Sequence, residues 1–246
     1  MGLAAMTLTD AREAVRRHDI TARALAEASL DALRLWQGEI NAAALIEPER
    51  ALRMAEAVDA AIAAGRDAGP LAGVPMAHKD MMYRAGRPAA CGSRVLADQV
   101  PDVTATALTR LDAAGAIDCG TLNMAELAYN PTGHNALTGH VRNPWSPAHI
   151  PGGSSSGSGA AVSCGAVFAA LGSDTGGSIR FPAACCGVTG IKPTLGRVPR
   201  TGTMGLCVSL DTIGPLARSA RDCALVLAAI AGSDSADPHS DPRPVP

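Results

Sequence analysis

Aromatic side chains are scarce in this chain: Phe, Trp and Tyr together account for 2% of the 246 residues, and the formal net charge is only −2. Proteins that bind single-stranded nucleic acid stack bases on aromatic rings, and broad basic surfaces attract nucleic acid or anionic lipid. Neither feature is present in the composition. We therefore expect no direct nucleic-acid partner, no membrane partner, and a core of Ala, Val, Leu, Ile and Met.

Long apolar runs, a leader segment and metal-binding cysteine pairs are missing as well. No stretch approaches about 18 uninterrupted apolar residues, and no apolar segment follows a basic start. The seven cysteines are odd in number and include no CxxC pair, so neither a disulfide framework nor a zinc site is indicated. These absences predict a cytoplasmic protein with reduced thiols.

Capping signals predict that the first part of the chain is helical. Thr7 with Asp10 forms a capping box for a helix that ends near His18, and Thr21 caps a second helix. Pro48 suits the first turn of a third helix. In the second helix, four apolar residues are expected to share one side: Leu25, Ala28, Leu33 and Leu35.

Beyond residue 66 the pattern alternates between helices and strands, which favours an α/β layered fold. Strands are expected within 69–80, 116–120 and 167–171. Helices are expected at 104–114, at 157–164, and from a capping box of Ser219 and Asp222 to Gly232. The polar, proline-rich segment that follows is expected to be a loop.

The stretch PGGSSSGSG at 151–159 has the composition of a flexible linker, but the apolar segment that directly follows it must be buried. It lacks the GxxxxGK[ST] and GxGxxG patterns of phosphate-binding loops. It matches GxSxG at 153–157, but that motif requires a preceding strand, and three prolines in NPWSPAHIP exclude one. A different kind of catalytic loop is therefore the better interpretation.

A second glycine-serine loop, GSDTGGS at 172–178, ends in Ser178. Backbone amides around a Gly-Gly pair can converge on one point, which places an oxyanion hole beside a serine nucleophile. The alternative is a tight turn with a buried serine. No histidine has an evident carboxylate partner in the sequence. Lys79 follows an apolar run, and burial would lower its pKa and make it a base, unless it is an ordinary surface lysine.

Taken together, these segments resemble the amidase signature family. The resemblance rests on GVPMAHKD (73–80), PGGSSSGSGAAV (151–162) and GSDTGGSIRFPAACCGVTGIKPTLGRV (172–198), and it extends over nearly the whole chain. Lys79, Ser154 and Ser178 are 75 and 24 residues apart, as in that family's Ser-Ser-Lys triad. His78 stands where family members commonly carry an aliphatic residue.

The resemblance implies an α/β fold with a mixed, centrally parallel β-sheet flanked by helices on both faces. It implies a single domain over 1–246, with a helical part (1–66), a catalytic core (67–232) and a polar tail (233–246). Family members are about twice as long, so we expect the fold to be incomplete at its C-terminus.

The resemblance also assigns roles within the site. Ser178 is the expected nucleophile, Ser154 the bridging serine after a cis peptide bond, and Lys79 the base. Ser155 is expected to support the triad, and no metal or organic cofactor is required. The backbone amides expected to form the oxyanion hole are those of Thr175, Gly176, Gly177 and Ser178.

The implied activity is hydrolysis of a small carboxylic amide through an acyl-enzyme, and a homodimer is compatible with it. There are two alternatives. One is the A subunit of a tRNA-dependent amidotransferase, which supplies ammonia, and the other is an inactive remnant. Phe181, and the stretch NPTGHN at 130–135, differ from those A subunits and favour a stand-alone hydrolase.

Overall fold

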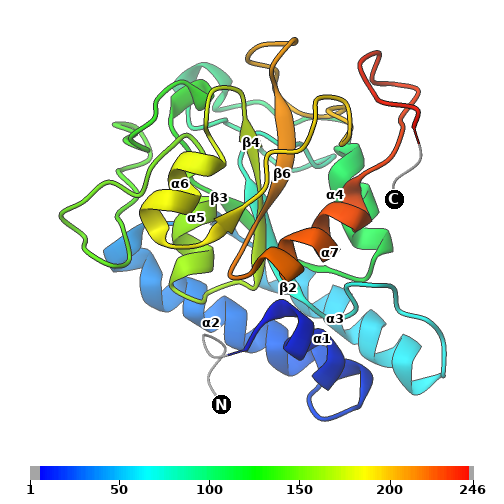
Figure 1. Cartoon of the computed structure of the whole chain (residues 1–246). Coiled ribbons are helices and arrows are strands. Elements are labelled where there is room, and N and C mark those ends of the chain that lie inside the picture. Colours follow the sequence, from blue (N-terminus) through cyan, green and yellow to red (C-terminus); the bar gives the residue numbers. More distant parts are fainter. Residues whose placement is uncertain (1–5, 244–246) are drawn as a thin grey trace.

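The computed structural model describes residues 6–243 (Figure 1). Its helices are α1 (Leu8–Arg16), α2 (Ala22–Ile40), α3 (Pro48–Ala63), α4 (Thr106–Ala113), α5 (Ser156–Ser163), α6 (Arg180–Cys186) and α7 (Ala220–Ile230). Its strands are β1 (Ala43–Ile46), β2 (Pro75–Lys79), β3 (Ile117–Leu122), β4 (Ala169–Asp174), β5 (Thr189–Gly190) and β6 (Thr212–Ala217). Two short 3₁₀ segments lie at Arg94–Leu96 and Glu126–Ala128.

The six strands form one mixed sheet in the order β1-β3-β2-β4-β6-β5. The three central strands β3, β2 and β4 are parallel, and the outer pairs are antiparallel. Helices α5 and α6 lie on one side of the sheet, and α4 and α7 lie on the other (Figure 1). The expected mixed sheet with a parallel centre and helices on both faces is therefore confirmed.

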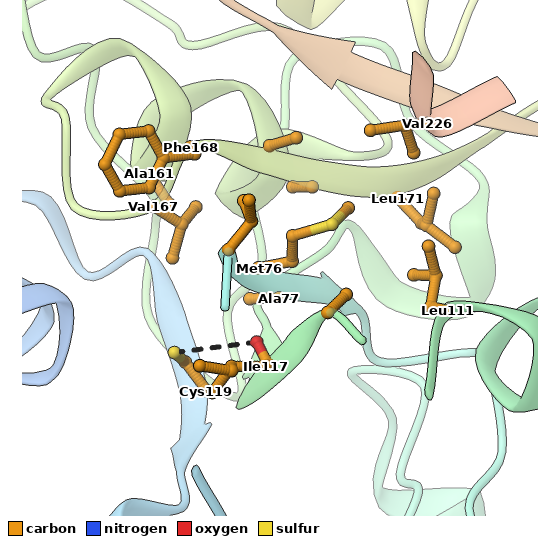
Figure 2. Close-up of a cluster of buried hydrophobic side chains, with 14 of the residues drawn as sticks. Met76, Ala77, Leu111, Ile117, Cys119, Ala161, Val167, Phe168, Leu171 and Val226 are labelled. Carbon is orange, nitrogen blue, oxygen red and sulfur yellow. Dashed lines mark hydrogen bonds between the residues drawn. The ribbon is translucent and has the colours of Figure 1, made fainter. Parts of the chain in front are cut away.

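The central strands are buried along their whole length, as parallel strands covered on both faces must be. Figure 2 shows Met76 and Ala77 of β2 between two groups of apolar side chains, one around Phe168 and the other around Leu111 and Leu171. The core contains few aromatic rings, as the composition predicts. Lys79 is itself one of its largest fully buried side chains.

The predicted helix starts are confirmed at both ends of the described chain, with one difference. Thr7 and Asp10 form the expected capping box at α1, and Ser219 accepts the Asp222 amide at α7. The Asp222 carboxylate does not complete the second box. It accepts the backbone amides of Leu8 and Thr9 instead, at 3.3 and 3.1 Å, and so joins α7 to α1.

The predicted buried side of α2 is only half right. Leu25 and Leu33 are buried, but Ala28 is exposed and Leu35 is 77% exposed. At 100° per residue, Ala28 and Leu35 point away from the stripe that contains Leu25 and Leu33. That stripe is completed by Ala22, Ala26, Ser29, Leu30 and Ile40.

Four elements were not predicted from the sequence: β1, β5, α6 and β6. The alanines of β1 favour helix by propensity, and Gly214 and Pro215 in the middle of β6 are typical of a turn. β4 also runs beyond the predicted boundary, to Asp174. Within residues 6–243 no helix is long and apolar enough to cross a membrane.

Candidate active site

Lys79 ends strand β2, and the neighbouring parallel strand β4 runs on to Ser173 and Asp174. Parallel neighbours bring their C-terminal ends to the same edge of the sheet, which is where α/β proteins place their sites. The N-terminus of α5 lies against this edge, because Ser155 bonds to Ser173. The three segments singled out in the sequence therefore meet at one place.

The Lys79 ammonium group is fully buried among hydroxyl groups. Its Nζ lies 2.7 Å from Ser154 Oγ and 2.9 Å from Ser173 Oγ. Within the described chain no carboxylate forms a salt bridge with it. Burial lowers the pKa of Lys79 to about 7, although the negative charge of Asp174 acts in the opposite direction. The neutral and charged forms are therefore both populated near neutral pH, and the alternative of a surface lysine is wrong.

The glycine-serine loop is buried in the core and is not a linker. Residues 151–155 are buried, and the Gly153–Ser154 peptide bond is cis, as the resemblance implies. The Gly153 amide donates to the Pro131 carbonyl at 2.7 Å, which fixes this loop to the turn around residues 130–133. Ser154 is held with its hydroxyl beside Lys79.

Ser155 joins the other two serines of the site through its backbone and its side chain. Its hydroxyl donates to the Ser173 carbonyl and accepts the Ser173 amide, both at 3.2 Å. Its own amide donates to the Ser178 carbonyl at 3.2 Å. A Cβ on Gly172 would lie 2.8 Å from Ser155 Oγ, so glycine is needed there. Ser155 therefore fixes Ser173 and the segment of Ser178 relative to each other.

Ser178 lies at the surface of the site, whereas Ser154 is fully buried. Within residues 6–243 no hydrogen bond joins the Ser178 hydroxyl to Ser154. The backbone bond to Ser155 nevertheless fixes the segment that carries Ser178 next to the cis peptide. The site therefore combines a partly exposed serine with a buried hydroxyl and a buried amine, the groups that a proton relay requires.

Asp174 determines which backbone amides of this loop remain available. Its fully buried carboxylate accepts the Gly177 amide at 2.7 Å and forms an ion pair with Arg180, with Nε at 2.9 Å. Burial alone would raise the pKa of Asp174, but the bonds from Arg180 and from backbone amides hold it below its usual range. The carboxylate is therefore charged at neutral pH.

One expected oxyanion donor is corrected by this contact. The Gly177 amide points at Asp174, so the amides that make no hydrogen bond among the described residues of the loop are those of Thr175, Gly176 and Ser178. Gly177 has φ +133°, and a Cβ there would lie 2.5 Å from the Phe181 ring. Residue 177 must therefore be glycine, because of its backbone conformation and because the Phe181 ring approaches it closely.

A cavity of about 280 Å³ lies beside Ser173, whose hydroxyl contacts the Lys79 amine. Ser173 and Asp211 lie in its wall. Asp211 accepts the Thr175 hydroxyl at 2.5 Å and the amides of Leu206 and Cys207 at 2.8 Å, so it joins the loop of Ser178 to the segment before β6.

Three residues of this arrangement were not singled out in the sequence: Ser173, Asp174 and Asp211. The first two lie inside the motif GSDTGGS, and Arg180 six residues after Asp174 is the available signal for their ion pair. Within residues 6–243, no group of three or more His, Cys, Asp or Glu side chains is arranged to hold a metal ion.

The chain is similar in sequence to known proteins. A family model described as Amidase matches residues 24–246. The A subunit of the glutamyl-tRNA(Gln) amidotransferase from Roseiflexus sp. (strain RS-1) is 47% identical over 241 residues, which are 98% of this chain and 49% of the relative. The chain thus spans about half the length of the curated relatives it matches.

Solved structures give the same result. The native peptide amidase from Stenotrophomonas maltophilia superposes with a TM-score of 0.93 at 37% identity, over 98% of this chain and 51% of that one. A chain from a vestigial protein complex that reveals the evolutionary origins of an s-triazine catabolic enzyme superposes with a TM-score of 0.94 at 41% identity, over 96% of this chain and 52% of that one.

Proposed function

The chain belongs to the amidase family, and from that premise we propose that it hydrolyses a small carboxylic amide through an acyl-enzyme on Ser178. The observation that carries the proposal is the 2.7 Å contact between Lys79 Nζ and Ser154 Oγ, deep in the core. Burial lowers the pKa of this lysine to about 7, so its neutral form can accept a proton at neutral pH.

The proposed acylation uses the three side chains in sequence. Neutral Lys79 accepts the proton of Ser154, and Ser154 accepts the proton of Ser178 as that hydroxyl turns inward. Ser178 Oγ then attacks the amide carbon and forms a tetrahedral intermediate. Contacts of this kind tighten when substrate binds, which is consistent with an open Ser178 hydroxyl here.

The intermediate collapses when the relay returns its proton to the leaving nitrogen, so ammonia or an amine departs. The free amides of Thr175, Gly176 and Ser178 are the candidate donors to the oxyanion. Water then attacks the acyl-enzyme by the same route, which releases the carboxylate and restores Ser178. The sequence of steps uses no group from outside the chain other than amide and water.

A fluorophosphonate probe tests the nucleophile. The purified protein should be labelled, and mass spectrometry of the digest should find the label on Ser178. Ser178→Ala should abolish labelling, while Ser209→Ala, which removes an exposed serine from a surface loop, should leave it unchanged. Labelling that persists in Ser178→Ala would rule out the assignment.

A second candidate function has a specific observation in its favour, because the relatives of this chain include an amidotransferase A subunit. In that role the same triad would release ammonia from glutamine for use by a partner. Glutaminase activity that appears only when a co-purifying partner is present would favour it. Hydrolysis of simple amides by the isolated protein, with glutamine a poor substrate, would favour the stand-alone hydrolase.

A further inference from the structure

The base makes a second contact that the proposed relay does not use. Lys79 Nζ lies 2.9 Å from Ser173 Oγ, and Ser173 Oγ lies 3.0 Å from the thioether sulfur of Met81. Met81 is 3% exposed and Ser173 is 5% exposed. These atoms form a buried chain that leads from the amine through Ser173 to Met81.

The chemistry of the sulfur fixes the direction of every proton in this chain. A thioether can only accept, so the Ser173 hydroxyl proton points at Met81. The Ser173 lone pairs are then left facing the amine, and an N–H of Lys79 donates to them. The lone pair of the neutral amine remains free for the one proton it must receive, that of Ser154.

The opposite orientation would block the relay. If the Ser173 proton pointed at Lys79, it would occupy the amine lone pair and compete with Ser154. Ser155 prevents the Ser173 backbone from moving out of place, because it bonds to both the amide and the carbonyl of that residue. With its backbone held, Ser173 could still rotate its side chain, and the hydrogen bond to Met81 prevents that rotation.

We propose that Met81 and Ser173 are positioning residues that keep the lone pair of Lys79 directed at Ser154. The proposal rests on the function proposed above. It goes further because it assigns to Met81 an effect on the base that acts only through the Ser173 hydroxyl.

A double-mutant cycle tests this coupling, with the rate of fluorophosphonate labelling measured against pH. Met81→Leu keeps the approximate volume and removes the acceptor, and it should slow labelling at the plateau by about fivefold, the effect of one weak hydrogen bond. In a Ser173→Ala background the same change should cost less than about twofold. Met82→Leu is the matched control, since Met82 is equally buried and lines the same cavity without bonding to Ser173.

A second readout does not depend on activity. The chain contains only two lysines, Lys79 and the exposed Lys192, so ¹³Cε-lysine labelling gives two signals, and Lys192→Arg assigns them. Ser173→Ala removes an acceptor from the ammonium form. It should therefore move the Lys79 midpoint, and the acid limb of the labelling rate, to lower pH by about half a unit or more.

The outcomes separate this inference from the function on which it rests. Effects of Met81→Leu and Ser173→Ala that simply add, or an unmoved Lys79 midpoint in Ser173→Ala, would overturn the positioning role while Ser178 labelling stands. Loss of plateau rate in Met82→Leu equal to that in Met81→Leu would assign the effect to packing. A wild-type protein that takes no label at all would remove both proposals together.

Discussion

Lys79 and His78 are neighbours on β2, and because successive strand side chains alternate between faces, they enter two different buried clusters. The hydroxyl cluster consists of Lys79, Ser154, Ser155 and Ser173. The arginine cluster, on the other face, consists of His78, Arg50, Arg84, Arg87, Asp112, Asp118 and Glu47. Both clusters hold charge inside the protein, and they do so in opposite ways.

In the arginine cluster each charge has a partner of opposite sign. Asp118 lies 2.6 Å from Arg84 Nε and 2.8 Å from Arg87 Nη2, and Arg84 also forms two bonds to Asp112. Burial would raise the pKa of Asp118, but the charge interactions with His78, Arg84 and Arg87 outweigh it and lower that pKa to about 2. The carboxylate therefore stays ionised throughout the neutral range.

His78 belongs to the same cluster, and its hydrogen-bond partners fix the position of its ring proton. Arg87 can only donate, and its Nη1 lies 2.9 Å from His78 Nε2, so that ring nitrogen must be the acceptor. The proton is then on Nδ1, which faces the Lys79 carbonyl at 3.3 Å. Burial lowers the pKa of His78 below its ordinary value, so the ring is neutral at neutral pH.

In the hydroxyl cluster the single charge has neutral partners only. Serine hydroxyls stabilise an ammonium group less than a carboxylate would, so desolvation dominates and the lysine titrates near neutral pH. The comparison indicates that a buried lysine can act as a base at neutral pH where no group of opposite charge is paired with it. A carboxylate in place of Ser173 would hold Lys79 protonated and stop the relay.

The largest effect is expected from removing the Lys79 amine, which has no ionic partner in the hydroxyl cluster. Lys79→Met keeps the side-chain bulk and deletes the base, so the fluorophosphonate labelling rate at pH 8 should fall about 10³-fold, within the range of general base catalysis. Lys192→Met, which changes the exposed lysine, should have no effect. A Lys79→Met rate within about tenfold of wild type would mean that another group is the base.

The next largest effect is a loss of stability when an ion pair of the arginine cluster is broken. Asp118→Asn leaves two buried guanidinium groups with reduced compensation, so the free energy of unfolding should fall by about 3–5 kcal/mol, as when other buried ion pairs are broken. Urea denaturation at pH 7 measures it, with Asp102→Asn as an exposed control. The molecules that remain folded should label at a rate within about twofold of wild type. A tenfold slower rate would show that the two clusters are not independent.

The sequence carries much of the fold through local signals. Thr7, Thr21 and Ser219 cap the helices that follow them, as predicted, because a cap needs only residues within one turn. β6 has no such signal, since Gly214 and Pro215 disfavour a strand. It forms because β4 on one side and β5 on the other pair with it.

The residues of the site likewise include some that local motifs indicate and some that they do not. Lys79, Ser154 and Ser178 were singled out from motif and spacing, and the structure brings the segments that carry them together. Ser173 acquires its role from contact with a lysine 94 residues away in sequence, and Asp211 from contact with Thr175 36 residues away. These two contacts depend on tertiary packing, which local patterns do not encode. The bond from the Gly177 amide to the Asp174 carboxylate is different, because it joins residues three apart in one motif, and the sequence analysis overlooked it.

The smallest predicted effect is the contribution of Lys79 to the pH dependence of stability. Its pKa is about 7 in the folded protein and near 10.4 in an unfolded chain, so between these values the unfolded state binds more protons. The contribution of Lys79 to stability must therefore rise with pH across this interval, by roughly 1.5 kcal/mol from pH 7 to 8.5. Below pH 7 both states are protonated and the contribution is constant. Urea denaturation at several pH values should give this slope as the difference in free energy of unfolding between wild type and Lys79→Met. The buried cysteines, whose pKa values are raised by burial, titrate in both proteins and cancel in this difference. Asp118 titrates far below this window, so the same difference should be found in the Asp118→Asn background. A difference that does not change with pH would show that Lys79 does not titrate in this interval and would contradict its lowered pKa.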